Sequence, residues 1–461
     1  MKLFCCFGEN FRKEFELSFA SEPSNDGLVS IYFYVFLPKT TTFAIMIVHI
    51  DCNNFFCSCE MASRPDLQGK PAVVANVTEA GGGIILALNK EAKALGLKRG
   101  NPIFQVKALL KAQQVTVFPV DHPKYEEFSR RIVHAVLKQD LLQDFVQYSI
   151  DEFFGELPID DLTMLRSYIA KIKDLIFETT GVAVSCGASG SYTLAKVATH
   201  YAKRYAGYEG ICILPRDKYE VALKKLAVSD VWGIGRKSSA KLQSSNILSA
   251  WDFVSLSEGY VRKLFSLPGV RTWYELKGTP CIDLKNQPQQ QSIMHSRTFA
   301  YMIPDLLGMK KEISNYVAAV CSRMRAQGSV CLCVSVFIAT NPHRSDLAQY
   351  ANNVSYKFLS PTADTLVINK VAMGLLEQIF KDGYQYKRAG VVLSEISDAS
   401  VVQLDLFQTA AHNPTKSRNL MSAIDQINEK FGVNMIHLSV QGNEAEETVR
   451  KGFKTFDRTV L

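Results

Sequence analysis

Short apolar runs bounded by polar or glycine-rich turns dominate the first part of the chain. The segments "MIVHIDC" from Met46, "PAVVANV" and "IILAL" are apolar and short, which predicts strands rather than helices. The segment "NKEAKALGLKRG" predicts a helix that ends at Gly96. "GVAVSCGASGS" predicts a further buried strand that leads into a glycine-rich turn. Strands and helices that alternate in this way indicate an α/β or α+β architecture.

The segment "YTLAKVATHYAKR" has the period of an amphipathic helix. Lys196, His200 and Lys203 fall at positions i, i+4 and i+7, so we expect the helix to present the two lysines together. A separate apolar stripe predicts the buried face of the helix. This stripe consists of Leu194, Val197, Ala198 and Tyr201.

The second half of the chain contains a glycine-rich helix start and a polar linker. "VWGIGRKSSAKL" is similar to a helix-hairpin-helix turn, in which the backbone N–H groups near Gly233 and Gly235 face a phosphate. A plain turn between two helices is the alternative for this motif. "KNQPQQQS" at 285–292 has the composition of a linker. Beyond it, strands alternate with helical stretches near 308–326 and 366–381, which predicts a small α+β domain.

Length and charge narrow the class of protein. A chain of 461 residues is too long for one core and predicts three or four domains. The 52 Lys and Arg residues exceed the 45 Asp and Glu residues, for a net charge of +7. Residues 216–395 hold 23 basic and 14 acidic side chains, so this part carries +9 and the remainder about −2. The asymmetry favours an anionic partner such as a phosphate backbone along one part of the molecule.

Cysteine usage and hydropathy argue against a secreted or membrane protein. The 11 cysteines form no CxxC pair, which is typical of a reducing cytosol. Cys57 and Cys59, like Cys331 and Cys333, are expected on strands, and zinc is disfavoured at both pairs. The apolar run at 28–37 is too short to cross a bilayer and has no basic flank, so we expect neither a membrane span nor a targeting segment. Met46 is the expected natural start, with residues 1–45 as an upstream extension.

Three carboxylates carry the candidate chemistry. Asp51 ends the first strand, and Asp151 and Glu152 lie next to each other in "YSIDEFF", a segment expected to form a β-hairpin. Neighbouring charges on an apolar strand are costly unless a partner neutralises them. A magnesium site with open positions for substrate phosphates would supply that partner. An Asp turn at residue 51 and a solvated turn at 151–152 are the alternatives.

Four motifs together resemble the Y-family of translesion DNA polymerases. They are "HIDCNNFFCSCE", "YSIDE", "GASGSYTLAKVATHYAK" and "VWGIGRKSSAKL", and the resemblance runs from about Met46 to the C-terminus. Within the family the chain is most similar to the UmuC branch, the catalytic subunit of bacterial DNA polymerase V. The segments "QLDLF" and "LMSAIDQINEKFG" near the C-terminus carry this last similarity.

The resemblance implies a right-hand polymerase of mixed α/β and α+β class. The implied domains are a palm, small fingers, a helical thumb with the helix-hairpin-helix, and a C-terminal α+β little finger. Their expected boundaries are 46–61 and 122–215 for the palm, 62–121 for the fingers, 216–289 for the thumb, 293–395 for the little finger and 396–461 for the tail with the clamp-binding motif.

The resemblance also implies roles for individual residues. Asp51, Asp151, Glu152 and the Cys52 carbonyl match the ligands of two Mg²⁺ ions, and Phe56 matches the steric gate that checks the sugar. A core position is the alternative for Phe56. Many relatives place a Tyr and an Arg three apart in the fingers, whereas this chain has Lys90 and Lys93. The implied nucleotide-binding residues are Phe55, Lys93 and Lys203; those for DNA are Gly233, Gly235, Arg236 and Lys237; those for the sliding clamp are Gln403, Leu404, Asp405, Leu406 and Phe407.

The implied activity is error-prone, template-directed transfer of nucleotides from dNTPs to a primer 3′-hydroxyl in the SOS response to DNA damage. The implied partners are primer-template DNA, the sliding clamp, a processed UmuD dimer and RecA, in the cytoplasm with the nucleoid. Three alternatives stay open: a non-catalytic scaffold for DNA and clamp, a nuclease with the same metal chemistry, and a polymerase IV (DinB)-like enzyme.

Overall fold

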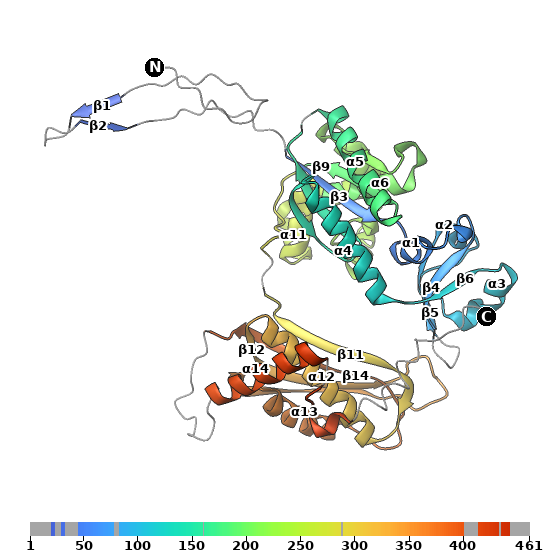
Figure 1. Ribbon diagram of the computed structural model, residues 1–461, viewed down its shortest axis with the longest axis vertical. Helices are drawn as coiled ribbons and strands as arrows, with labels where there is room; N and C mark the ends of the chain where they lie inside the picture. The colour runs from blue at the N-terminus through green and yellow to red at the C-terminus, as the bar shows by residue number, and fades with distance from the viewer. Residues whose placement is uncertain are drawn as a thin grey trace. The chain divides into compact units, whose positions relative to one another are not determined.

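The computed structural model separates the chain into two compact units, one formed mainly by residues up to Lys285 and the other mainly by residues from Asn286 onward (Figure 1). Most of the expected extension at 1–45 and all of the expected clamp motif at 403–407 lie outside the described residues. Within the extension, β1 (Ala20–Pro23) and β2 (Val29–Tyr32) form an antiparallel pair. The structure describes residues 20–23, 29–32, 45–77, 83–159, 161–286, 289–400, 414–432 and 435–442.

A five-stranded sheet forms the centre of the first unit. Its order is β10-β9-β3-β8-β7, and only β10 and β9 pair in parallel. The expected strands and the hairpin are therefore confirmed. The strand bounds are β3 (Met46–Cys52), β7 (Gln143–Gln147), β8 (Glu152–Leu157), β9 (Val184–Ser189) and β10 (Ile211–Ile213).

Helices cover both faces of this sheet. Helices α4 (His122–Lys138) and α5 (Leu162–Thr180) form one core with Val48 and Ile50 of β3 and Phe153 of β8. Helix α6 (Tyr192–Arg204) contacts β9, β3 and β10, and its Tyr192 and Ala195 cluster with Ile47 and Phe154. Because side chains alternate along a strand, the positions two and four residues after Ile47 and the position two residues before Phe154 face α6 as well. These positions include Asp51 and Glu152.

Helix α6 approaches β9 closely at Gly187. A Cβ atom on Gly187 would meet the backbone nitrogen of Thr199 and the backbone oxygen of Ala195. Ser191 caps the helix by accepting a hydrogen bond from the Leu194 N–H at 3.3 Å. Gly187, in the middle of the segment "GVAVSCGASGS", therefore allows the helix to lie against the sheet.

We expect Gly187→Ala to destabilise the protein by about 1–3 kcal/mol, because the added methyl must displace helix backbone rather than a flexible side chain. Urea unfolding of the variant and the wild type measures this difference. Gly207→Ala is the matched control, since a Cβ at Gly207 has no neighbour within 4 Å. Equal unfolding midpoints for the two variants would contradict the close-approach argument.

A smaller sheet follows β3 in the chain. Its order is β5-β4-β6, formed by β4 (Ala72–Val77), β5 (Gly83–Leu88) and β6 (Thr116–Pro119). Helix α2 (Lys90–Ala94) begins at the cap residue Asn89, and α3 (Ile103–Ala112) precedes β6. The expected strands and the helix before Gly96 are confirmed.

One expectation about the segment after β3 is wrong. Cys57 and Cys59 lie on helix α1 (Phe55–Met61), not on a strand, and both are fully buried. Asn54 has a left-handed backbone conformation with φ 49°, which ends the extended chain directly before the helix. Cys331 and Cys333 lie on a strand, as expected.

Short helices α7 to α11 complete the first unit. Their bounds are α7 (Tyr219–Lys225), α8 (Arg236–Gln243), α9 (Ala250–Val254), α10 (Glu258–Leu264) and α11 (Leu267–Leu276). Glu275 of α11 is fully buried and accepts hydrogen bonds from the N–H groups of Thr193 at 3.0 Å and Cys281 at 2.8 Å. This carboxylate joins the helical segment to the start of α6.

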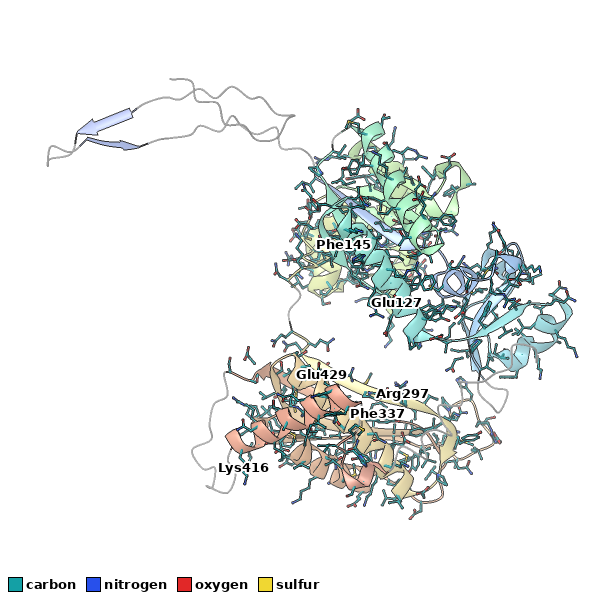
Figure 2. All side chains as sticks on the ribbon, viewed as in Figure 1. Glu127, Phe145, Arg297, Phe337, Lys416 and Glu429 are labelled. Carbon is teal, nitrogen blue, oxygen red and sulfur yellow. The ribbon has the colours of Figure 1, made fainter. Side chains whose placement is uncertain are left out.

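The second unit is an α+β fold around a four-stranded antiparallel sheet of order β11-β14-β12-β13. Its core lies between the sheet and two helices. On the other face of the sheet lies Phe337, which Figure 2 labels. The Arg388 guanidinium lies 5.5 Å from its ring centre. The bounds are β11 (Ser292–Ile303), α12 (Leu306–Ala326), β12 (Ser329–Thr340), β13 (Ala351–Thr362), α13 (Thr365–Ile379) and β14 (Tyr386–Asp398).

A further helix, α14 (Pro414–Phe431), packs onto this second unit. Arg325 of α12 forms a bidentate pair with Asp425, with N–O distances of 2.6 and 2.7 Å. Met421 is 2% exposed and its sulfur accepts from the Thr365 N–H. The C-terminal segment "LMSAIDQINEKFG" is thus folded against the α+β unit. Among the described residues, no helix has the length and apolar character that crossing a membrane requires.

Candidate active site

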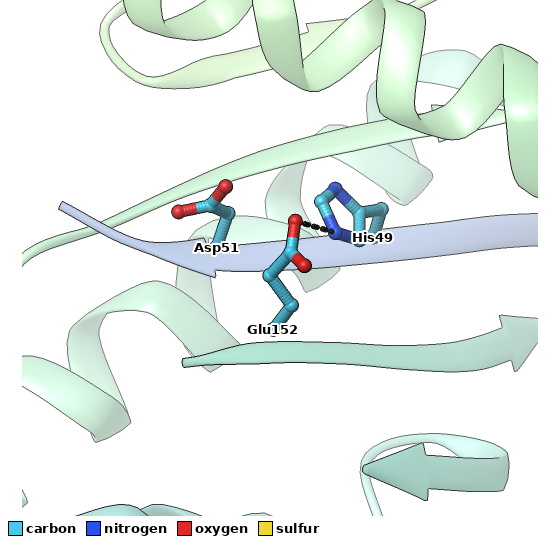
Figure 3. Close-up of side chains that lie close together, drawn as sticks. All are labelled: His49, Asp51 and Glu152. Atoms are coloured by element: carbon cyan, nitrogen blue, oxygen red, sulfur yellow. Dashed lines mark ion pairs between the residues drawn. The ribbon is translucent and has the colours of Figure 1, made fainter. Parts of the chain in front are cut away.

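The antiparallel pairing of β3 and β8 brings two of the three predicted carboxylates together. Asp51 is the register partner of Glu152, and the Cys52 N–H donates to the Asp151 carbonyl at 2.9 Å. Figure 3 shows the Asp51 and Glu152 side chains on the same side of these strands, next to His49. Residues a hundred positions apart in the chain therefore form one acidic pocket.

Two lysines of α6 face this pocket. Lys203 forms an ion pair with Asp51, and the Lys196 Nζ lies 2.7 Å from Glu152 Oε1. The predicted common presentation of the two lysines is confirmed. His200, the third residue predicted on that face, instead has its Nε2 3.1 Å from Nη1 of Arg204.

The two carboxylates have opposite pKa shifts. Burial raises the pKa of Asp51 to about 6, although Lys203 opposes the shift. Burial also acts to raise the pKa of Glu152, but its neighbours His49 and Lys196 outweigh burial and lower the pKa to about 2. Burial lowers the pKa of His49 to about 4, so the imidazole is neutral at pH 7. Lys196 is therefore the cation that stabilises ionised Glu152 at neutral pH.

His49 is a member of the pocket to which no role was assigned from the sequence. One ligand atom each of His49, Asp51 and Glu152 lies within 4.8 Å of the others. The His49 Nδ1 is 2.9 Å from Thr199 Oγ1, and Nε2 is 3.5 Å from Glu152 Oε1, beyond hydrogen-bonding distance. The signal in the sequence was its spacing, since His49 and Asp51 are two apart on one strand.

Asp151 lies in the turn between β7 and β8, outside that group of three. Its Oδ1 accepts a hydrogen bond from Ser149 Oγ at 2.8 Å, and the same hydroxyl accepts from the Glu152 N–H at 3.1 Å. Ser149 thus fixes the turn that leads into Glu152. The pocket fits a divalent cation such as Mg²⁺, because carboxylate oxygens are its preferred protein ligands.

Phe56 packs on an aromatic neighbour that the sequence did not reveal. Its ring stacks on Tyr125 of α4 with centres 4.2 Å apart and planes at 15°. The Tyr125 hydroxyl donates to Glu60 at 3.0 Å, and Lys124 holds the other oxygen of Glu60 at 2.6 Å. Phe56 is partly exposed, whereas the Phe55 side chain is 3% exposed and belongs to the core. The buried Phe55 side chain is therefore closed to a ligand, so a nucleotide contact by Phe55 would have to use its backbone.

Lys93 of α2 reaches back to the start of α1. Its Nζ donates to the Asn54 side-chain oxygen at 2.6 Å, three residues after Asp51. Lys90, by contrast, is largely exposed and lies 3.8 Å from Glu91. Of the two lysines in "NKEAK", Lys93 is the one that contacts the segment directly after β3.

The glycine-rich turn before α8 is exposed. Gly233 has φ 88°, a conformation that favours glycine, and Gly235 is the cap residue of α8. Gly233, Gly235, Arg236 and Lys237 are all exposed to solvent. The described part of the chain therefore presents this turn on a surface, as a phosphate contact requires.

Comparison with known proteins identifies the family. Residues 50–200 match the impB/mucB/samB family, and residues 290–406 match its C-terminal domain. The protein UmuC of Salmonella typhimurium is 31% identical over 410 residues, which cover 88% of this chain and 96% of that protein. The chain belongs to the Y-family of DNA polymerases.

The similarity to other Y-family members also covers most of the chain. A DNA polymerase IV of Oceanobacillus iheyensis is 26% identical over 410 residues, with 87% of this chain and 93% of that protein covered. The solved structure of the Y-family DNA polymerase chimera Dbh-Dpo4(243-245)-Dbh superposes with a TM-score of 0.61 at 22% identity, covering 77% of this chain and 99% of that one. The expected right-hand fold with palm, fingers, thumb and little finger is confirmed.

Proposed function

We propose that this protein is an error-prone translesion DNA polymerase of the SOS response, which transfers nucleotides from dNTPs to a primer 3′-hydroxyl. The observation that carries the proposal is the pairing of Asp51 with Glu152 across β3 and β8, with a lysine of α6 on each carboxylate. Polymerase chemistry needs carboxylates for metal and cations for phosphate within one pocket.

Asp51, Asp151, Glu152 and the Cys52 carbonyl are the proposed ligands of two Mg²⁺ ions. When bound, such a pair lowers the pKa of the attacking hydroxyl and stabilises the leaving pyrophosphate. The protein positions the oxygens by strand register, and Ser149 fixes the turn that carries Asp151 and Glu152. Reaction rate then depends mainly on positioning and charge neutralisation.

The nucleotide would contact residues around the acidic pocket. Lys203 is 37% exposed, more than its ion-pair partner Asp51 at 18%, and would turn toward a triphosphate. Lys93 would add charge from the fingers, but a lysine lacks the planar fork of arginine. Phe56, supported by Tyr125, is the proposed steric gate, and the Phe55 backbone lies beside it.

Primer-template DNA would lie along the basic part of the chain. The turn at Gly233, Gly235, Arg236 and Lys237 would contact its backbone phosphates. The proposed thumb at 216–289 carries +5 and the proposed little finger at 293–395 carries +4. We propose palm boundaries of 46–61 and 122–215 and fingers at 62–121; the separate five-stranded and three-stranded sheets support this division.

Further partners are proposed from the family. Gln403 to Phe407 would dock on the sliding clamp and raise the local concentration of the polymerase. A processed UmuD dimer and RecA would be partners if this chain acts like its relative UmuC, in the cytoplasm with the nucleoid. A polymerase IV-like enzyme that works without them is the second candidate, favoured by the 26% identity to DNA polymerase IV.

Primer extension by the purified full chain tests the proposal. We expect extension of a primed template by dNTPs with Mg²⁺, continuation past an abasic site, and complete loss in excess EDTA. DNA binding without extension would favour a non-catalytic scaffold, and degradation of the primer would favour a nuclease. Addition of clamp, processed UmuD and RecA to the same assay separates the UmuC-like from the polymerase IV-like candidate.

A further inference from the structure

The ammonium group of Lys196 lies inside a box of aromatic rings. Its Nζ is 4.7 Å from the ring centre of Tyr148, 5.2 Å from that of Trp232 and 5.7 Å from that of Phe154. Tyr148 and Trp232 meet edge to face at 89°, and the Trp232 Nε1 donates to the Tyr148 hydroxyl at 3.2 Å. The same ammonium is 2.7 Å from Glu152 Oε1.

This environment separates Lys196 from Lys203. The Lys196 side chain is 13% exposed, whereas Lys203 is 37% exposed and pairs with Asp51. Within the part of the chain that the structure describes, no aromatic ring lies over the Lys203 ammonium. Ring faces attract a cation and restrict its position, and they do so more strongly where water is excluded. Lys196 is therefore held in one place, where it binds Oε1 of Glu152.

One wall of the box belongs to the thumb. Trp232 immediately precedes Gly233, and a Cβ on Gly233 would come within 2.5 Å of the Thr272 hydroxyl, so the turn packs tightly against α11. Trp232 also packs with Phe154 of β8, at 6.4 Å between ring centres. The exposed glycine-rich turn and the acidic pocket are thus connected through adjoining side chains.

We propose that Lys196 is a positioning residue for Glu152, and that Trp232 links the DNA-contacting turn of the thumb to this carboxylate through Lys196. The inference rests on the proposed polymerase function. Movement of the turn on DNA shifts a wall of the box, and the box sets where Glu152 lies. A positioning role requires that loss of the cation slows nucleotide transfer more than it weakens nucleotide binding.

Steady-state extension of a primer by one nucleotide tests the role of Lys196. We expect Lys196→Met, which keeps most of the side-chain volume, to lower kcat by about tenfold while the KM for dNTP changes less than about threefold. Lys196→Arg keeps the charge and should recover kcat to within about threefold of the wild type. An unchanged kcat in Lys196→Met would overturn the proposal.

A double-mutant cycle tests the link through Trp232. Trp232→Ala removes one wall, so it should lower kcat by about tenfold, and the double variant with Lys196→Met should lose no more than either single variant. Trp251→Ala is the matched control, because Trp251 is another thumb tryptophan with a lysine, Lys224, 5.8 Å from its ring centre. If the two substitutions lower kcat independently, so that their effects multiply in the double variant, Trp232 does not act through Lys196.

Binding of Mn²⁺ alone, followed by electron paramagnetic resonance, gives a readout without catalysis. Lys196→Met removes a positive charge 2.7 Å from Glu152, so we expect Mn²⁺ to bind at least about threefold tighter although extension is slower. A variant that merely unfolds would lose both Mn²⁺ binding and primer extension. If the wild type extends primers but Lys196→Met leaves both the Mn²⁺ affinity and kcat unchanged, only this inference is contradicted. If Lys196→Met shifts the Mn²⁺ affinity but the wild type does not extend primers, only the proposed function is contradicted.

Discussion

Glu152→Gln should remove primer extension almost completely, with kcat/KM lower by about 10³-fold or more, because a pocket that gathers metal and phosphate charge loses one of its anions. The amide keeps an oxygen acceptor for Lys196 and nearly the same volume, so the variant should fold. Extension of a labelled primer measures the loss, and circular dichroism checks the fold. The Kd for primer-template DNA, from fluorescence anisotropy, should stay within about threefold, because the proposed DNA contacts lie elsewhere.

Glu156→Gln is the matched control for this variant. Glu156 lies four residues further along β8 and is the register partner of Ile47, away from the acidic pocket. Its extension rate should stay within about twofold of the wild type. Substantial residual extension in Glu152→Gln would contradict the metal assignment.

The same assay on Asp51→Asn and Asp151→Ala tests which of the other carboxylates bind metal. Asp51 belongs to the group of three whose ligand atoms lie within 4.8 Å, and Asp151 instead accepts a hydrogen bond from Ser149. The proposed set of ligands predicts a comparable loss for both variants. A loss confined to Asp51 and Glu152 would restrict the metal site to these two residues.

Local periodicity predicted the elements that carry the site. Helix α6 runs from Tyr192 to Arg204, the range of the quoted amphipathic segment, and its predicted apolar stripe is buried. Strand β3 places Asp51 near its end, as its apolar run indicated. Both features depend on residues that are close in the chain, so the sequence alone was sufficient to predict them.

Contacts between distant segments were not predictable in the same way. Thr199 lies 150 residues from its partner His49, and Tyr125 stacks on Phe56 from a different helix. No local pattern specifies such a pair, because strand register and helix packing bring it together. The error at Cys57 has a related cause: a short apolar run with residues two apart fits a strand, and the left-handed Asn54 that starts a helix leaves no clear periodic signal.

The same limit explains the missed role of Lys196. Its helical face was predicted, but the rings that surround its ammonium come from a turn, a strand and the thumb. Only the folded chain shows that Lys196 is enclosed and Lys203 is open to solvent. This difference supports the proposed roles, in which Lys196 positions a carboxylate and Lys203 contacts a triphosphate.

Phe56→Ala should allow ribonucleotides into the growing strand. We expect the ratio of kcat/KM for dNTP over rNTP to fall on the order of 10²-fold, because exclusion of a 2′-hydroxyl depends on a steric clash that the smaller side chain cannot provide. The ring is well placed for such a clash, since it rests on Tyr125 at 4.2 Å and cannot move back without displacing a buried side chain. Single-nucleotide incorporation with dCTP and CTP opposite template guanine measures the ratio.

Phe177→Ala controls for the loss of a phenyl ring, because Phe177 lies on α5 and is 55% exposed. Tyr125→Phe tests the support itself: it keeps the stacked ring and removes only the hydroxyl bond to Glu60, so discrimination should be preserved. If Phe56→Ala retained full discrimination, the sugar would be checked by another side chain. If Tyr125→Phe lost discrimination as strongly as Phe56→Ala, the hydrogen bond to Glu60, rather than ring stacking, would hold Phe56 in place.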